Sequence, residues 1–363
     1  MSGKILILSW CNADNVMNYG QILQAIAMIQ LVRSDYDGEI DYISYHPRTM
    51  KNKIRCILER YSPLSGHLMP YCKTKEMINK VCKENNVKLY QISNAHKLEE
   101  MSSAYNLMIC GSDQIWHPRN YFPEYFLDFG NDAIVRKSYA ASLPKSSIEP
   151  QFASAYEKMR KSLERLDYIS VRECSSKNLI ETLSGKNADI VLDPTFLIPK
   201  ERWETLVEYI KIPKRYIFVY IPNGMDNSIE QKIDQLSSAI GVQDIVILMT
   251  RGNNRFKRYK TIKFVTVGQF LYLIKHADYI FTSSFHAAVF SIIMKKQFSC
   301  HTVYDSEQGE DTRFTDLLEP LGLDTRIDND TSFNEHINYN KLSKILEEKL
   351  NFSRKTLNKI IST

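Results

Sequence analysis

The sequence lacks the features that mark several specialised classes of protein. Its seven cysteines are odd in number, dispersed and free of any C-x-x-C pair, which argues against a disulfide framework and against a zinc site. No apolar stretch reaches the ~18 residues that a membrane span requires. The apolar run near the N-terminus is also too short for a signal peptide. We therefore expect a protein of the reducing cytoplasm that does not span a membrane.

Nucleotide-binding motifs and a strong charge excess are missing too. Neither G-x-G-x-x-G nor the P-loop pattern occurs, so a dinucleotide or nucleoside-triphosphate site has no motif to support it. The net charge of +5 is too small to indicate a nucleic-acid-binding protein. It suits an anionic substrate or a loose contact with an anionic membrane surface.

The remaining composition is that of an ordinary folded protein. Hydrophobic residues make up 44% and charged residues 25% of the chain, so neither disorder nor a fibrous repeat is indicated. A chain of 363 residues is long enough for two domains, each with its own core.

Short apolar runs alternate with segments of helical spacing, such as 20–33. Continuous apolar runs are typical of strands buried on both faces, as in a parallel sheet covered by helices. The expected strands are 4–10, 40–45, 106–110, 168–171 and 189–192, followed by 216–221, 244–249, 262–267, 279–282 and 298–303.

This alternation predicts an α/β fold of two doubly wound, Rossmann-like halves. We place the N-terminal domain at 1–198, with a mostly helical insertion near 46–104, and the C-terminal domain at 199–338. The boundary within 194–213 is soft. Residues 339–363 are expected to form an amphipathic helix that docks on the body of the protein or, alternatively, contacts a membrane surface.

Polar residues gather where the expected strands end. Ligands of open parallel sheets bind beyond the carboxyl ends of the strands, next to the N-termini of helices. Four strand ends carry such sets: "CNADNVMNYGQ", "GSDQIWHP", "REC" and "SSFHA".

Each of these candidates has a plain structural alternative. Gly20 either lets a ligand approach a helix N-terminus or forms a tight turn. Asp113 either faces a ligand or caps the next helix. Trp116 either stacks on a sugar or packs in the core.

The charged candidates leave similar choices. Arg172 either holds a carboxylate or phosphate with its guanidinium fork or pairs with Glu173. Arg251 and Arg313 are weaker candidates for binding an anion. His286 is either a packed histidine or the acid of an active site, and no second ligand stands at metal-binding spacing from it.

Several motifs, taken in order, resemble those of the polysaccharide pyruvyl transferase family over roughly residues 5–325. They are "NYGQILQAIA", "GSDQIW", "SYAAS", "SVRE", "LDPT", "SFHAAVFS" and "RFTDLLEPLGL". Each motif alone is weak, whereas the ordered set is fairly specific.

The resemblance implies two Rossmann-like domains that face a cleft, as in glycosyltransferases of the GT-B fold. It also implies transfer of a pyruvyl group from phosphoenolpyruvate to a sugar, of galactose type, in a surface polysaccharide or its lipid-linked precursor. The product would be a cyclic ketal, with release of phosphate. The resemblance implies no metal or organic cofactor, since phosphoenolpyruvate is a co-substrate.

The resemblance also implies roles for individual residues. His286 would be the general acid, because histidine supplies an acid of near-neutral pKa. Arg172, followed by Arg313, would hold the donor. The substrate-binding residues that we predict are Asn18, Tyr19, Gly20, Gly111, Ser112, Asp113, Gln114, Trp116, Ser142, Arg251, Ser284 and Arg313.

One departure from the family pattern affects the donor site. Some members carry an arginine two residues before the histidine, where this chain has Ser284. If that arginine binds phosphate, Arg251 and Arg313 gain importance here. Two other functions compete with pyruvyl transfer: a nucleotide-sugar glycosyltransferase, and a non-catalytic saccharide-binding protein.

Overall fold

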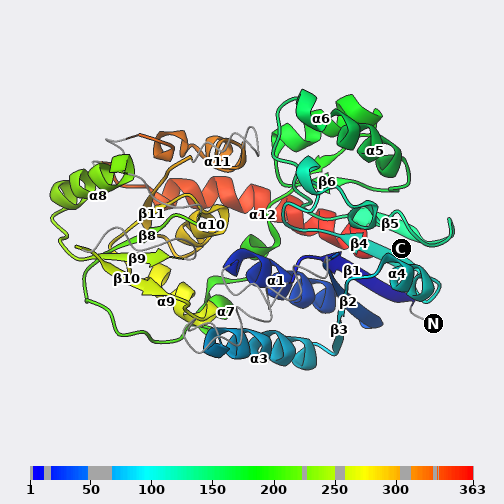
Figure 1. The fold of residues 1–363 in the computed structure, drawn as a ribbon, viewed down its shortest axis with the longest axis horizontal. Coiled ribbons are helices and arrows are strands. Elements are labelled where there is room, and N and C mark those ends of the chain that lie inside the picture. The colour runs from blue at the N-terminus through cyan, green and yellow to red at the C-terminus, as the bar shows by residue number, and fades with distance from the viewer. Residues whose placement is uncertain are drawn as a thin grey trace.

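Two parallel sheets of five strands each make up the two halves of the molecule (Figure 1). The computed structural model describes residues 3–11, 18–47, 68–222, 227–249, 258–302, 312–329, 333 and 335–362. The first sheet has the order β3-β2-β1-β4-β5. Its strands are β1 (Lys4–Ser9), β2 (Glu39–Tyr45), β3 (Val87–Ile92), β4 (Leu107–Cys110) and β5 (Val135–Ser138).

The second sheet repeats this topology with the order β10-β9-β8-β11-β12. Its strands are β8 (Ile217–Tyr220), β9 (Ile245–Met249), β10 (Lys260–Lys263), β11 (Tyr279–Thr282) and β12 (Gln297–Cys300). All of these pairings are parallel. The two sheets confirm the predicted α/β class with doubly wound halves.

Burial explains why the apolar runs form the central strands. Every residue of β4, β8 and β11 is buried, as expected for strands that helices cover on both faces. Each such Leu, Ile, Val or Phe side chain contributes about 1.5–3 kcal/mol through its removal from water. Each of these strands also has a neighbouring strand on both sides.

Helices cover the two sheets. In the first half they are α1 (Tyr19–Asp35), α3 (Leu68–Glu84), α4 (Ala95–Ser102), α5 (Ala153–Glu164) and α6 (Cys174–Ser184). In the second half they are α8 (Asn227–Ile240), α9 (Val267–His276), α10 (Phe285–Ile293) and α11 (Arg313–Leu318). Helix α1 contacts α3 on its own side and α9 and α10 of the second half, so it lies between the halves.

Some local expectations need correction. The described part of 46–104 contains helices α3 and α4 and also strand β3, which extends the first sheet. The expected strand 262–267 ends at Lys263. Thr266 and Gln269 instead form a capping box that starts α9, because each side chain accepts a hydrogen bond from the other's backbone N–H.

Strand β5 was not expected, since its sequence, VRKS, is polar. The guanidinium of its buried Arg136 donates to the carbonyl oxygens of Leu127, Ile134, Phe129 and Asn131. The short strands β6 (Ser170–Val171) and β7 (Asp189–Ile190) pair beside it. Isolated β-bridges, including one between Ala141 and Val171, join this short pair to β5 and the segment after it.

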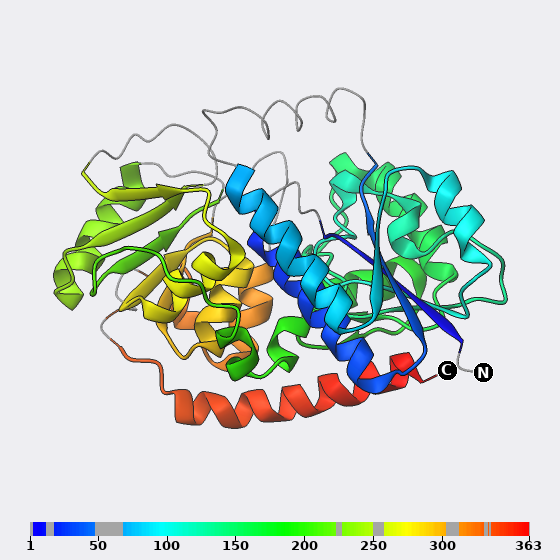
Figure 2. The same ribbon diagram turned by 90° about the horizontal axis from the view of Figure 1, so that it is seen from below.

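The connection between the halves runs through the short helices η4 (Pro194–Leu197) and α7 (Lys200–Glu204). The last helix, α12 (Tyr339–Ile361), then runs along both halves and ends beside the first sheet (Figure 2). Its buried residues include Leu357 and Ile360, so it docks on the body as the first of the two alternatives expected.

Candidate functional site

The two strand-end motifs lie at equivalent positions of the two sheets. Strand β4 pairs with β1, which also pairs with β2, so the sheet order reverses between β1 and β4. The order reverses in the same way between β8 and β11. Ligands of such sheets bind at these reversal points. "GSDQIW" follows β4 and "SSFHA" follows β11, which places both at the expected edges.

Asp193 joins residues of the two halves into one cluster. One of its oxygens, Oδ2, accepts hydrogen bonds from Arg172 Nη1 at 3.0 Å and from Ser112 Oγ at 3.0 Å. The same oxygen lies 3.5 Å from Nε2 of His286, which comes from the second half. The other oxygen accepts bonds from the backbone N–H and hydroxyl of Thr195. His286 therefore belongs to a buried charged cluster and not to an apolar core.

The charges in this cluster depend on one another. Burial alone would raise the pKa of Asp193, but the charge and hydrogen bonding of His286, the charge of Arg172 and the Thr195 hydrogen bond hold it below its usual range. Burial alone would lower the pKa of Arg172. The carboxylates of Glu173, Asp193 and Asp113 reverse this effect and raise it. Both groups are thus charged at neutral pH.

The guanidinium fork of Arg172 is mostly occupied. Its Nε donates to Glu173 Oε1 at 2.6 Å, and Nη1 is bound to Asp193. The plane lies over the ring of Phe285, with Cζ 3.9 Å from the ring centroid. Nη2 has no hydrogen-bond partner among the described residues and lies 3.8 Å from Asp113 Oδ1. The ion pair with Glu173 is therefore present and buried. Of the three guanidinium nitrogens, Nη2 alone has no hydrogen-bond partner among the described residues.

Glu173 is the second carboxylate that holds Arg172. It accepts hydrogen bonds from Ser142 at 2.7 Å and Ser176 at 2.8 Å, and burial raises its pKa against the opposing effect of Arg172. Ser142 is fully buried, and its hydroxyl supports Glu173 in this structure.

Gly20 is the residue that His286 faces. A Cβ atom on Gly20 would lie 2.1 Å from Nδ1 of His286 and 2.6 Å from its Cγ, far closer than atoms can pack. Gly20 is the second residue of α1, so neither a turn nor a positive φ explains it. The close approach predicted for a ligand is made by the imidazole, which reaches the N-terminus of α1 because this position has no side chain.

We expect Gly20→Ala to displace the imidazole and to lower kcat about 10²-fold, the scale of loss for a ~1 Å misplacement. Alanine is the better helix former by about 1 kcal/mol, so helix propensity would not cause this loss. Steady-state kinetics and thermal unfolding of the variant measure both effects. Gly241→Ala is the control: Cβ meets nothing within 4 Å there, while φ is +65°, so stability should fall and kcat should not. Unchanged kcat in Gly20→Ala would contradict the importance of this contact.

The segment after β4 faces the same cluster. Besides Asp193, Ser112 Oγ lies 3.0 Å from the carbonyl oxygen of Ala140. Asp113 has φ +78° and accepts a hydrogen bond from the N–H of Gln114, but no α-helix follows it, so it does not cap a helix. Gly111 has φ +112°, and a Cβ there would lie 2.1 Å from the carbonyl oxygen of Tyr139. The backbone thus requires glycine at 111.

Two of the residues predicted to bind substrate have side chains that are buried in packing contacts. Trp116 is 1% exposed, stacks on Phe126 with centroids 4.9 Å apart, and donates its indole N–H to the carbonyl of Tyr125. Tyr19 is 2% exposed and stacks on Phe270 of the second half at 4.4 Å. Trp116 is therefore a packing residue, and Tyr19 helps to join the halves.

Two other predicted residues start helices of the site. Asn18 Oδ1 accepts the N–H of Gln21 at 3.3 Å and caps α1. Ser284 Oγ accepts the N–H of Ala287 at 3.4 Å and caps α10. Ser284 thus fixes the start of the helix that carries His286.

Of the other two arginines, only Arg313 can be placed. It is the first residue of α11, and its Nη1 donates to Gln114 Oε1 at 3.3 Å, across the space between the halves. Arg251 lies outside the described residues.

The sequence named Glu173 only as a possible ion-pair partner of Arg172 and did not single out Asp193, although both stand in the quoted motifs "SVRE" and "LDPT". For Asp193, the available signal was an acidic residue directly after an apolar strand. Their partners, however, come from distant parts of the chain, and the pattern of residues does not show these contacts.

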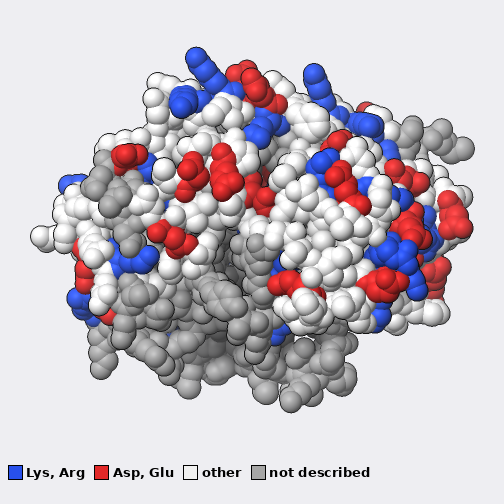
Figure 3. Space-filling view, turned by 90° about the horizontal axis from the view of Figure 1, so that it is seen from above, with Lys and Arg blue, Asp and Glu red and all other residues white. Residues whose placement is uncertain are grey.

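The described residues include no group of three or more His, Cys, Asp or Glu side chains placed to hold a metal ion. Six cysteines lie in the described ranges, and none of these six forms a disulfide. Within the same ranges no helix combines the length and apolar character of a membrane span. Basic and acidic side chains are interspersed over the face shown in Figure 3.

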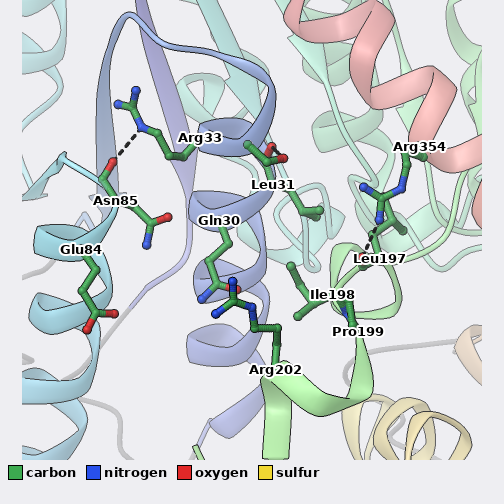
Figure 4. A pocket seen from close by; sticks show the side chains of 11 residues that line it. Gln30, Leu31, Arg33, Glu84, Asn85, Leu197, Ile198, Pro199, Arg202 and Arg354 are labelled. Carbon is green, nitrogen blue, oxygen red and sulfur yellow. Dashed lines mark hydrogen bonds between the residues drawn. The ribbon is translucent and has the colours of Figure 1, made fainter. Parts of the chain in front are cut away.

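A groove of about 460 Å³ lies away from this cluster (Figure 4). Its lining includes Gln30 and Arg33 of α1, Arg202 and Arg354. Gln30 and Arg33 lie at least ten residues along α1 from Gly20, or ~15 Å at 1.5 Å per residue. None of the sequence-predicted site residues lines this groove.

Comparison with known proteins agrees with both fold and motifs. The sequence model of the family "Polysaccharide pyruvyl transferase" matches residues 18–302. No curated protein sequence matches this chain.

Solved structures of low sequence identity share the fold. A putative UDP-N-acetylglucosamine 2-epimerase from Listeria monocytogenes has 10% identity and a TM-score of 0.53, with 99% of this chain and 91% of that chain covered. The corresponding epimerase from Rickettsia bellii has 9% identity and a TM-score of 0.54, with 99% and 96% covered. A mutant O-GlcNAc transferase from Thermobaculum terrenum has 10% identity and a TM-score of 0.50, with 100% and 64% covered. The fold is therefore GT-B-like.

Proposed function

The chain belongs to the polysaccharide pyruvyl transferase family of enzymes, and on this premise we propose that it moves a pyruvyl group from phosphoenolpyruvate to a hexose. The acceptor would be a galactose-type sugar of a surface polysaccharide or its lipid-linked precursor. The product would be a cyclic ketal, with release of phosphate. The observation that carries the proposal is the meeting of His286 with Asp193 and Arg172 where the halves join.

The reaction needs an acid and then a way to remove protons. His286 gives a proton to the methylene carbon of phosphoenolpyruvate, which leaves an oxocarbenium-like centre at C2. A sugar hydroxyl adds to C2 and loses its proton to the imidazole. Phosphate then leaves with the electron pair of the C2–O bond, and a second hydroxyl adds in its place. The proton of that hydroxyl departs with phosphate, so the enzyme returns to its starting state.

Asp193 supplies a counter-charge for this step. Its carboxylate lies 3.5 Å from Nε2 of His286 and keeps its negative charge at neutral pH, because its pKa is held below its usual range. The protonated imidazole therefore has an ion-pair partner in place before the substrate binds. Such preorganised charge avoids reorganisation during the reaction.

The donor carries a carboxylate and a phosphate, so it needs at least two cationic contacts. We assign one to Nη2 of Arg172, the nitrogen that makes no hydrogen bond with a described residue. The second is Arg313, whose Nη1 donates to Gln114 of the first half and whose guanidinium fork suits a carboxylate or a phosphate. This assignment replaces the arginine that some relatives carry at the position of Ser284.

One assay tests the proposed activity. The purified protein is incubated with phosphoenolpyruvate and a galactose-terminated lipid-linked saccharide, and both free phosphate and the mass of the saccharide are followed. We expect phosphate release that depends on acceptor and a saccharide heavier by one pyruvyl ketal. Sugar transfer from a nucleotide-sugar donor would instead identify a glycosyltransferase. Saccharide binding without turnover of either donor would identify a binding protein.

A further inference from the structure

Aromatic side chains gather at the carboxyl ends of β1 and β2, beside the reaction cluster. Trp10 follows β1, Tyr45 ends β2, and both meet the ring of Tyr125 edge-on, with centroids 5.8 Å and 5.7 Å apart. Phe122 meets Tyr125 in the same way at 6.2 Å. Tyr45 and Tyr125 are buried, whereas Trp10 and Phe122 stay partly exposed. The partly exposed rings of Trp10 and Phe122 thus both pack against the buried ring of Tyr125.

One oxygen of a carboxylate in this aromatic cluster has no hydrogen-bond partner among the described residues. Glu124 is 9% exposed, and its Oε2 makes no hydrogen bond with any residue that the structure describes. Burial raises the pKa of Tyr45, and the charge of Glu124 and a hydrogen bond to the Glu124 side chain raise it further. Leaving a buried acceptor unsatisfied costs about 1–3 kcal/mol, so such an atom calls for an explanation. A ligand that donates a hydrogen bond would supply one.

This cluster is continuous with the reaction centre. Burial raises the pKa of Tyr125, a hydrogen bond with Trp10 lowers it, and the charges of Tyr45, Glu124 and Asp113 raise it. Asp113 in turn lies 3.8 Å from Arg172. On the other side, Ser9, the residue before Trp10, donates through its hydroxyl to the carbonyl oxygen of Ser112. A molecule on Trp10 would therefore reach toward the cluster of Asp193 and His286.

We propose that Trp10, Phe122 and Glu124 form the subsite for the acceptor hexose, a neutral sugar. One face of the sugar ring lies against Trp10, and Glu124 accepts a hydrogen bond from a sugar hydroxyl. Aromatic surface with a few placed polar groups is the usual composition of a small-molecule site. The aromatic cluster contains the carboxylate of Glu124 and no cation, so it repels the anionic donor. The donor and the acceptor would therefore bind at separate places. This inference rests on the proposed pyruvyl transfer for the identity of the acceptor.

Binding of a neutral sugar tests the subsite without any turnover. Saturation-transfer NMR with methyl β-galactoside should show binding to the wild-type protein. Glu124→Gln keeps the size of the side chain but replaces an acceptor oxygen by a donor, and it should weaken binding about tenfold. Trp10→Ala should weaken it by at least as much. Tyr209→Ala, at an aromatic residue that is 71% exposed on the linker between the sheets, should leave binding unchanged.

Kinetics separate failure of the subsite from failure of the proposed reaction. With the lipid-linked acceptor, Glu124→Gln should raise the acceptor KM about tenfold while the phosphoenolpyruvate KM stays within about twofold. If the wild-type enzyme turns over and neither variant changes binding or the acceptor KM, the subsite is overturned. Absence of galactoside binding to the wild type also overturns it. If the galactoside binds as expected but no acceptor is pyruvylated, the proposed reaction fails and the saccharide subsite stands.

Discussion

His286→Ala should lower kcat about 10²- to 10⁴-fold, the range that a positioned general acid contributes. Without the imidazole, neither neighbour of His286 can replace it as the acid: Asp193 is ionised because its pKa is held below its usual range, and Arg172 keeps its proton. Loss of His286 also removes the partner of Asp193 Oδ2 from the second half. Phosphate release at saturating donor and acceptor measures the effect.

The control for this substitution is His276→Ala, on the neighbouring helix α9 of the same half. His276 packs against Tyr272 with ring centroids 4.2 Å apart and takes no part in the cluster. Its variant should keep wild-type kcat. Circular dichroism must show that both variants fold. More than about a tenth of wild-type activity in folded His286→Ala would remove this residue from the role of acid.

Arg172→Met should lower the free energy of unfolding by about 3–5 kcal/mol at pH 7, the usual cost of leaving buried carboxylates without their cation. Arg172 and Asp193 have side chains exposed by 2% and 0%, and Glu173 by 1%, so water does not replace the lost partner. Denaturant titration measures the loss. The control is Arg160→Met, because Arg160 pairs with Glu157 and Glu164 at the surface, where such pairs contribute about 0–1 kcal/mol.

The effect of Arg172→Met on the free energy of unfolding should also depend on pH in a definite direction. In the wild type the depressed pKa of Asp193 means that its ionised form contributes stability above its unfolded pKa, and this contribution is lost as pH falls through the folded pKa. In Arg172→Met the pKa values of Asp193 and Glu173 both rise, so the folded variant takes up protons at higher pH. The stability gap between variant and wild type should therefore narrow from pH 7 toward pH 5. A gap that widens in this interval would contradict the role given to Arg172.

The sequence was informative about the fold wherever local pattern decides structure. The apolar runs that became β4, β8 and β11 are buried on both faces, and their composition alone predicts this. Strand β5 escaped prediction because carbonyl oxygens accept the hydrogen bonds of the buried Arg136 guanidinium, an arrangement that no local pattern reveals. Tertiary contacts there override the polar composition.

The site shows the same division. Strand-end position was enough to select His286, Arg172 and Ser112, which the structure brings together around Asp193. It also selected Trp116 and Tyr19, which are buried. Position along a strand says that a residue lies near the edge of the sheet, but not which way its side chain points. That choice depends on packing partners such as Phe126 and Phe270.

The final helix also sets the order in which the protein is completed during synthesis. The side chain of Lys137, on β5, donates to the backbone carbonyls of Lys359 and Ile360, 222 and 223 residues later. The fully buried Leu357 and Ile360 belong to the same hydrophobic core as Ile5 and Leu107. At 5–20 residues per second the ribosome needs roughly 10–45 s to cover this interval. During that time the first half has its strands but not α12. The apolar surface that α12 covers therefore stays exposed until the whole second half has been synthesised.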